Sequence, residues 1–161
     1  MTTDERYATL RGTRLATELT DEQCRRLADL IVLTDVAEGD VLVREGTSDS
    51  HLYVVTKGVM GVVKNHGTDD AVTLNTLTAG DFSGELGFLD GMERYASLVA
   101  LSDGRVVGIT RERLESLLPV DPQLVYRVMR AIVRVTHLIQ RRLAMQQTEL
   151  SNYIYKQHGK Y

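Results

Sequence analysis

The sequence predicts an α+β fold in which an antiparallel β jelly-roll barrel is flanked by N-terminal helices and by one long C-terminal helix. Between residues 32 and 110, short runs rich in β-branched and aromatic residues alternate with glycines, a pattern typical of antiparallel sandwiches and jelly-roll barrels. From Gln123 to about Lys156 the chain contains neither proline nor glycine, which favours one continuous helix. A chain of 161 residues suits one domain with a sizeable core.

The composition excludes several classes of protein. The formal net charge of −3 provides no general basic field for nucleic acid. No apolar run approaches the ~18 residues of a membrane-spanning helix, and the N-terminus lacks the apolar core of a signal peptide. Cys24 is the only cysteine, so an internal disulfide is impossible. We therefore expect a cytoplasmic protein without a membrane partner.

Residues 1–31 are expected to form a helical lead-in. Thr20 has the side chain of an N-cap, and Gln23 stands at the position that completes a capping box. The spacing of the following apolar residues predicts a helix that packs on the flank of the domain. These residues are Cys24, Leu27, Ala28 and Ile31.

Residues 32–110 are expected to form the strands of the jelly roll. Glycine and aspartate residues lie between or beside the β-prone runs and favour turns. Apolar and polar residues alternate over 72–75, as in a half-buried strand, whereas 41–43 and 52–55 are continuously apolar, as in strands covered on both faces. The predicted strands are Val32–Val36, Val41–Arg44, His51–Thr56, Val59–Lys64, Ala71–Leu77, Ser97–Leu101 and Val106–Ile109.

Four motifs follow one another along this region: Ala37-Glu38-Gly39-Asp40, Arg44-Glu45-Gly46, Leu52-Tyr53-Val54-Val55 with Gly58, and Gly80-Asp81-Phe82-x-Gly84-Glu85-Leu86. In this order the chain resembles the cyclic nucleotide-binding domain family. That family provides the sensor domains of catabolite-activator-type regulators, cyclic-nucleotide-dependent kinases and gated channels. The resemblance covers roughly residues 20–145.

Residues 80–97 carry the chemistry of an anion site. A short helix over Glu85–Leu89 offers free N–H groups and the positive end of a dipole to a phosphate. Gly84 allows the backbone to approach an anion closely, and Arg94 can add a charge-assisted bond. Glu85 is unfavourable beside an anion unless it accepts a hydrogen bond from a ribose hydroxyl, which would select a ribose cyclic phosphate. The structural alternative is a Glu85–Arg94 salt bridge that stabilises an empty turn.

The resemblance implies the same roles, with Glu85 on the ribose, Arg94 on the phosphate, and backbone amides around the phosphate. Tyr95 departs from the family pattern, in which a small residue usually follows the arginine, and its bulk must turn outward or into the pocket. The absence of a threonine at this position favours cAMP over cGMP. The expected ligand-binding residues are Phe82, Gly84, Glu85, Leu86, Gly87, Arg94, Tyr95 and Ala96.

Residues 111–156 are expected to form C-terminal helices, and residues 157–161 a tail. Arg111–Leu118 predicts a short helix, and Asp121 followed by Pro122 marks the start of the long one. Two apolar faces on the long helix predict two partners, the barrel and the same helix of a second subunit in a homodimer. One face is Val125, Val128, Ile132, Val135 and Ile139, and the other is Leu124, Ala131, Leu138 and Met145.

The resemblance also implies that the long helix caps the purine base. Thr136 and Gln140 are the candidate base contacts, and Gln146 or Gln147 are less favoured. The arginines of this helix are interpreted as a solvated face. After Arg142 only about twenty residues remain, too few for the helix-turn-helix of the family's transcription factors, so we expect no direct DNA binding.

The sequence therefore predicts a stand-alone cyclic nucleotide-binding regulatory protein. Its ligand, cAMP or cGMP, would move the C-terminal helix and so signal to an unknown effector protein. The alternative is a degenerate domain that binds no nucleotide and serves as a dimerisation or scaffold module. We expect no enzyme, cofactor or metal site, because metal chemistry needs clustered ligands and the four histidines lie on unrelated elements: His51, His66, His137 and His158.

Overall fold

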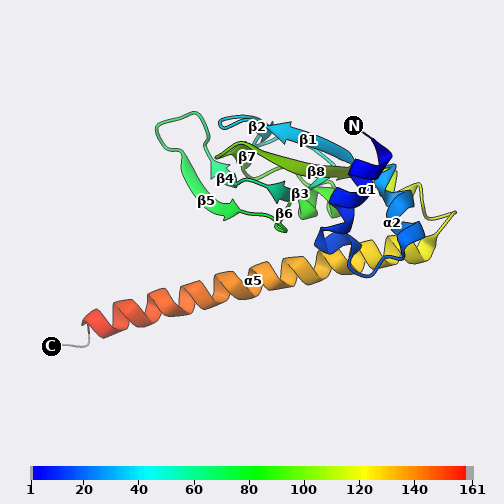
Figure 1. Cartoon of the computed structure of the whole chain (residues 1–161). Coiled ribbons are helices and arrows are strands. Elements are labelled where there is room, and N and C mark those ends of the chain that lie inside the picture. The colour runs from blue at the N-terminus through cyan, green and yellow to red at the C-terminus, as the bar shows by residue number, and fades with distance from the viewer. Residues whose placement is uncertain (1, 159–161) are drawn as a thin grey trace.

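Two antiparallel four-stranded sheets form the centre of the computed structural model, which describes residues 2–158 (Figure 1). The first sheet has the strand order β1-β8-β3-β6, and the second has the order β2-β7-β4-β5. The strands are β1 (Val32–Val36), β2 (Val41–Val43), β3 (His51–Lys57), β4 (Met60–Lys64), β5 (Val72–Leu77), β6 (Phe82–Ser83), β7 (Ser97–Ala100) and β8 (Gly104–Thr110).

The predicted jelly roll is confirmed, although its two sheets do not close into a barrel. Most successive strands lie in opposite sheets, which is the double-sheet arrangement of a jelly roll. Within residues 2–158, however, the strand ladders run inside each sheet and do not close one sheet onto the other. The edge strands β2 and β6 contain only three and two residues, so they offer few backbone groups for such closure.

The first sheet is covered on both faces, because helices pack against one face and the second sheet against the other. Along β3, Leu52 and Val54 join the cluster that includes the helices, whereas Val55 joins the cluster between the sheets. This arrangement confirms the prediction from the continuous apolar run at 52–55.

Strand β5 differs from its prediction. The alternation at 72–75 predicts a half-buried strand, but the side chains of Val72 and Leu74 are 54% and 49% exposed. β5 is an edge strand of the second sheet and pairs only with β4 among the described strands. The inner end of the strand is buried at Leu77.

The helices lie beside and below the first sheet (Figure 1). The predicted capping box is confirmed, since the Thr20 hydroxyl accepts from the N–H of Gln23 and the Gln23 side chain accepts from the N–H of Thr20, each at 3.2 Å. The helical elements are α1 (Thr3–Arg11), the 3₁₀ turn η1 (Arg14–Ala16), α2 (Asp21–Ala28), α3 (Glu85–Asp90), α4 (Arg111–Glu115) and α5 (Pro122–His158).

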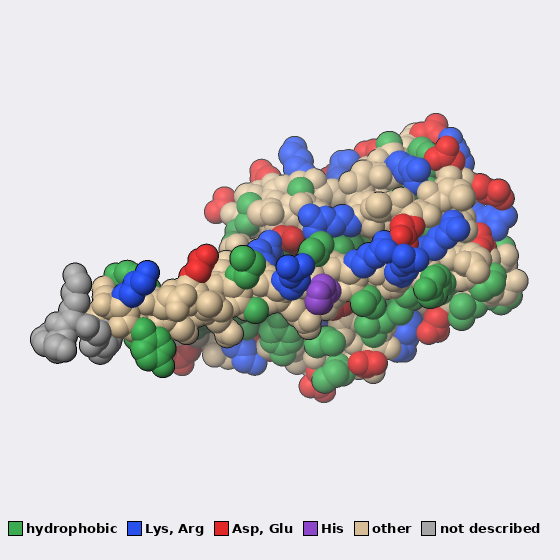
Figure 2. Space-filling model, turned by 90° about the horizontal axis from the view of Figure 1, so that it is seen from below, with side chains coloured by type: hydrophobic (Ala, Val, Ile, Leu, Met, Phe, Trp, Pro, Cys, Tyr) green, Lys and Arg blue, Asp and Glu red, His purple; other side chains and the backbone are tan. Residues whose placement is uncertain are grey.

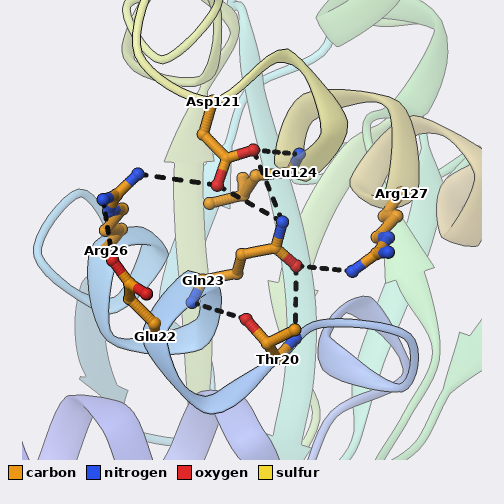
Figure 3. Close-up of polar contacts among 7 residues, drawn as sticks. All are labelled: Thr20, Glu22, Gln23, Arg26, Asp121, Leu124 and Arg127. Carbon is orange, nitrogen blue, oxygen red and sulfur yellow. Dashed lines mark hydrogen bonds and ion pairs between the residues drawn. The ribbon is translucent and has the colours of Figure 1, made fainter.

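Gln23 also ties α2 to the first turn of α5 (Figure 3). Its amide nitrogen donates to both carboxylate oxygens of Asp121, at 3.4 and 3.3 Å, and its amide oxygen accepts from Arg127 at 2.8 Å. Asp121 in turn accepts from the N–H of Leu124 at 3.0 Å, as a cap of α5. One glutamine therefore serves the N-termini of two helices.

Helix α5 packs on the domain with its first half and extends past the sheets with its second half (Figure 1). Leu124 and Ala131 are buried together with most of the first predicted apolar face, whose last residue, Ile139, is only partly buried. Leu138 and Met145 are 50% and 64% exposed. The helix continues slightly beyond its predicted end near Lys156, and the last residues of the predicted tail, 159–161, lie outside the described residues. Within 2–158, no helix is both long and apolar enough to cross a membrane.

Candidate functional site

All of the favoured ligand-contact residues line one cavity of about 450 Å³. The cavity lies between the second sheet, the segment from Phe82 to Ser97, and α5. A larger, more open groove of about 1100 Å³ between α1 and the ends of β1, β3 and β8 contains none of them. The predicted residues in the smaller cavity are Phe82, Gly84, Glu85, Leu86, Gly87, Arg94, Tyr95, Ala96, Thr136 and Gln140.

Gly84 connects β6 to α3 in a backbone conformation that favours glycine. Its φ is 92° and its ψ 13°, in the left-handed region. A Cβ atom at this position would lie 2.5 Å from the carbonyl oxygen of His51 and closer still to the guanidinium of Arg94. The absence of a side chain at Gly84 therefore lets Arg94 approach the backbone closely, which places the guanidinium against the N-terminus of α3.

Arg94 is a buried cation whose hydrogen bonds are incomplete. Its side chain is 8% exposed, donates to the carbonyl oxygen of His51 at 2.5 Å, and lies 3.6 Å from a carboxylate oxygen of Asp49. Its Nε is buried without a hydrogen-bond partner among the described residues. Because an unpaired buried donor is costly, this nitrogen favours an additional acceptor.

Asp49 holds this corner of the site together. One carboxylate oxygen accepts from the backbone N–H of His51 at 2.9 Å and lies 2.5 Å from the ring nitrogen Nδ1 of His51. The His51 ring stacks on Tyr53 with 5.4 Å between the ring centroids. Burial, with a smaller contribution from the Asp49 charge, raises the pKa of Tyr53 to about 12, so this phenol is neutral at physiological pH.

Glu85 is half-buried at the cavity and forms no ion pair with Arg94; within residues 2–158 the carboxylate paired with Arg94 is Asp49. The salt bridge considered as a structural alternative is therefore not present. Tyr95 is 62% exposed at the rim and does not fill the cavity. Partial desolvation and the nearby charge of Glu85 raise the pKa of Tyr95.

Helix α5 closes one side of the cavity. Thr136, Ile139, Gln140 and Leu143 contribute to the lining, whereas Gln146 and Gln147 do not. The Thr136 hydroxyl donates to the carbonyl oxygen of Ile132 at 2.9 Å, which leaves its oxygen able to accept. The amide of Gln140 is exposed and has no hydrogen-bond partner among the described residues.

Sequence reasoning missed three sets of residues near the site. Leu74 and Asn75 of β5 line the cavity, and the exposed alternation of that strand is the signal that indicates them. Asp49 pairs with Arg94, but it stands in a loop where its sequence neighbours indicate only a turn. Lys64 and Glu45 form an ion pair beside Tyr95, which no local pattern predicts because the two residues lie on different elements.

Sequence comparisons with known proteins point to one family. A family model described as "Cyclic nucleotide-binding domain" matches residues 19–121. An NTE family protein of Mycobacterium tuberculosis is 32% identical over 133 residues, which are 83% of this chain and 22% of that protein. The cGMP-dependent protein kinase, isozyme 1, of Drosophila melanogaster is 29% identical over 97 residues, 59% of this chain and 13% of the kinase. The chain thus spans less than a quarter of either relative.

A solved structure that is described as a cyclic nucleotide-binding domain has a similar fold. A cyclic nucleotide-binding domain from Methylobacillus flagellatus superposes with a TM-score of 0.74 at 24% identity, covering 87% of this chain and 79% of that one. The family match extends over more than half of the sequence, from α2 to the start of α5, and includes the whole segment from Phe82 to Ala96. The chain therefore belongs to the cyclic nucleotide-binding domain family.

Proposed function

We propose that this chain is a regulatory sensor that binds a cyclic nucleotide, with cAMP favoured over cGMP, in the cavity between the second sheet and α5. The observation that supports this proposal best is the buried Arg94, whose Nε has no partner among the described residues. Arg94 lies at the wall of the cavity that the favoured ligand-contact residues line. A cyclic phosphate would supply the acceptor that Nε lacks, and its negative charge would suit the buried guanidinium.

The phosphate would bind between Arg94 and the N-terminus of α3. The first N–H groups of a helix have no partner inside the helix, and they carry the positive end of its dipole. Arg94 packs against Gly84, immediately before these groups, so both donors can serve one anion. Glu85 follows Gly84 and would accept a hydrogen bond from the ribose 2′-hydroxyl.

The base would contact α5, and this contact would carry the signal. Thr136 and Gln140 are polar groups of α5 at the cavity, beside the apolar Ile139 and Leu143. The same helix is tied to the turn before β6 by Arg142, which lies 3.8 Å from the Asp81 carboxylate. A ligand that binds better to one position of α5 shifts the helix toward that position.

The output would pass through a homodimer or an effector protein. Figure 2 shows basic side chains along α5 with hydrophobic side chains among them. Val133, Leu138 and Met145 are each at least half exposed, which suits a contact with the same helix of a second subunit. We retain the expectations of a cytoplasmic location, of no catalytic activity, and of no direct binding to DNA or membranes.

Titration calorimetry with cAMP and cGMP tests the proposal. We expect binding of the wild-type protein, with tighter binding of cAMP, and a loss of affinity of about 100-fold or more in Arg94→Ala, because a buried charge-assisted hydrogen bond is removed. Arg44→Ala is the matched control, since Arg44 is exposed and its side chain lies outside the cavity. No heat at millimolar nucleotide with folded protein would overturn the proposal.

The engagement of Arg94 by Asp49 supports a second candidate function, a degenerate domain that serves as a dimerisation or scaffold module. In that case the Asp49 carboxylate would permanently replace the phosphate as the anion beside Arg94. This candidate predicts a stable dimer in sedimentation experiments and no heat with either nucleotide. Measurable binding would exclude it.

A further inference from the structure

The peptide unit between Tyr95 and Ala96 is held by the protein on one side only. The Lys64 ammonium donates to the carbonyl oxygen of Tyr95 at 2.9 Å. The N–H of Ala96, on the other side of the same peptide, has no hydrogen-bond partner within residues 2–158, although Ala96 is only 8% exposed. Ala96 lines the cavity, whereas Lys64 does not.

Planarity connects these two sides. A trans peptide keeps its C=O and N–H antiparallel in one plane, so a bond that fixes the carbonyl oxygen also fixes the direction of the N–H. Lys64 therefore determines where the free N–H of Ala96 points, and this direction is away from Lys64. A buried N–H without a partner is rare, which indicates that an acceptor from outside the chain completes it.

Lys64 is itself held in place by Glu45. One Glu45 carboxylate oxygen pairs with the Lys64 ammonium, the other accepts from the N–H of Asn65 at 2.8 Å, and the Glu45 N–H donates to the Ser97 hydroxyl at 3.0 Å. The hydrogen bond from Lys64, and to a smaller extent the one from the Asn65 N–H, hold the pKa of the Glu45 carboxyl below its usual range. The Glu45 carboxylate thus neutralises Lys64, so Lys64 contributes geometry rather than net charge to the site.

The backbone on the other side of Tyr95 is also fixed. The N–H of Gly46 donates to the carbonyl oxygen of Arg94 at 2.7 Å, and the N–H of Arg94 donates to the carbonyl oxygen of Thr47 at 2.9 Å. The Arg94–Ala96 segment is therefore attached to the loop that contains Glu45 through two backbone hydrogen bonds and through the Lys64–Glu45 pair.

We infer that Lys64 is a positioning residue for the phosphate site: it holds the Tyr95 carbonyl so that the N–H of Ala96 is presented to one exocyclic oxygen of a cyclic phosphate. This inference rests on the proposed function, because it requires that the cavity bind a cyclic nucleotide. Lys64 touches no ligand atom and acts through the Tyr95–Ala96 peptide alone.

Phosphorothioate analogues of cAMP separate positioning from a general loss of structure. In the Rp and Sp analogues, sulfur replaces one or the other exocyclic oxygen and accepts hydrogen bonds poorly. Lys64→Met should bind cAMP about tenfold more weakly, the cost of a misplaced hydrogen bond to a charged group. The analogue whose sulfur faces Ala96 has already lost this bond, so Lys64→Met should hardly weaken its binding. The variant should weaken the other analogue about tenfold, and the Rp to Sp affinity ratio should change by the same factor.

Lys57→Met is the matched control, because Lys57 is exposed and forms no ion pair among the described residues. If the wild-type protein binds cAMP but Lys64→Met leaves the affinity and the ratio unchanged, or weakens both analogues equally, the inference is wrong and the proposed function stands. If the wild-type protein binds neither cAMP nor cGMP, the proposed function is wrong and the inference falls with it.

Glu45→Gln supplies a second variant should Lys64→Met fail to fold. Glutamine keeps an acceptor for Asn65 but leaves the Lys64 charge without its counter-ion. If Lys64 positions the Tyr95–Ala96 peptide, Glu45→Gln should bind cAMP more weakly, because Lys64 is no longer held in place. Tighter binding would show that Lys64 acts through its charge and would overturn the inference.

Discussion

Replacing Gly84 with alanine tests whether the junction of β6 and α3 requires glycine for its backbone conformation alone or also because Arg94 lies so close. The left-handed φ of 92° costs a non-glycine residue about 1–2 kcal/mol. The new Cβ would also meet the His51 carbonyl oxygen at 2.5 Å and the Arg94 guanidinium, and relieving such overpacking costs about 1–3 kcal/mol more. The expected loss of unfolding free energy is therefore about 2–5 kcal/mol.

Gly39→Ala is a matched control, because Gly39 has a φ of 91° but no atom lies within 4 Å of the place that its Cβ would take. Thermal denaturation followed by circular dichroism should give the two variants Tm values that differ by about 2–12 °C, since 1 kcal/mol corresponds to about 2–4 °C in a domain of this size. Equal Tm values for both variants would refute the reasoning, because the contact with Arg94 and His51 would then cost nothing.

Three further predictions concern the surroundings of the site. Asp49→Asn should lower the free energy of unfolding by about 1–3 kcal/mol, because the buried Arg94 loses its carboxylate partner, and urea denaturation measures this loss. The same variant should bind cAMP more tightly in calorimetry, because the carboxylate no longer competes with the phosphate for Arg94. Gln23→Ala should lower stability by about 1–3 kcal/mol in urea, because the Asp121 cap and the Arg127 guanidinium lose a partner. Spectrophotometric titration should show that the Tyr53 phenol ionises near pH 12, and this transition should be missing in Tyr53→Phe. Because the pKa of Tyr53 is higher in the folded than in the unfolded protein, its contribution to the free energy of unfolding is complete below pH 10 and is lost as the pH rises toward 12.

Each of these predictions has a control on the same kind of side chain. Asp69→Asn, Gln147→Ala and Tyr126→Phe change exposed residues outside the cavity and the capping network. Asp49→Asn with unchanged stability would show that the Asp49–Arg94 pair contributes nothing. A Gln23→Ala variant as stable as Gln147→Ala would contradict the role of the shared cap, and a Tyr53 phenol that ionises with the exposed tyrosines would contradict its burial.

Local patterns predicted the parts of the fold that depend on neighbours in sequence. The capping box at Thr20 and Gln23 and the continuous run at 52–55 were sufficient to predict a helix start and a doubly covered strand. The glycine spacing indicated jelly-roll strands, but β6 is a two-residue strand with no detectable period, so it was missed. Closure of the sheets depends on distant edges, which no local window contains.

For the site, sequence identified which residues meet at the cavity but not how they pair. Glu85 and Arg94 stand nine positions apart and suggest an ion pair, yet the guanidinium turns to Asp49, which the fold brings from a separate loop. Lys64 lies on β4, and its contact with the Tyr95 carbonyl depends on the pairing of β4 with β7. Such partners follow from the register of strands distant in sequence, which amino-acid patterns do not encode directly.

If nucleotide binding moves α5 as proposed, the contacts of Gln23 with Asp121 and Arg127, here called the clamp, would let the helix act as a lever. Its first turn is fixed to α2, the cavity contacts lie near Gln140, about 29 Å along the axis, and the described end at His158 lies about 55 Å along it. A rigid tilt about the clamp would therefore move the described end of the helix about twice as far as the part that lines the cavity. Electron–electron distances between spin labels at Asn152 and Thr76 should change more on nucleotide addition than those between labels at Arg141 and Thr76. A displacement of about 1 Å where α5 lines the cavity would then become about 2 Å at His158, beyond the two sheets.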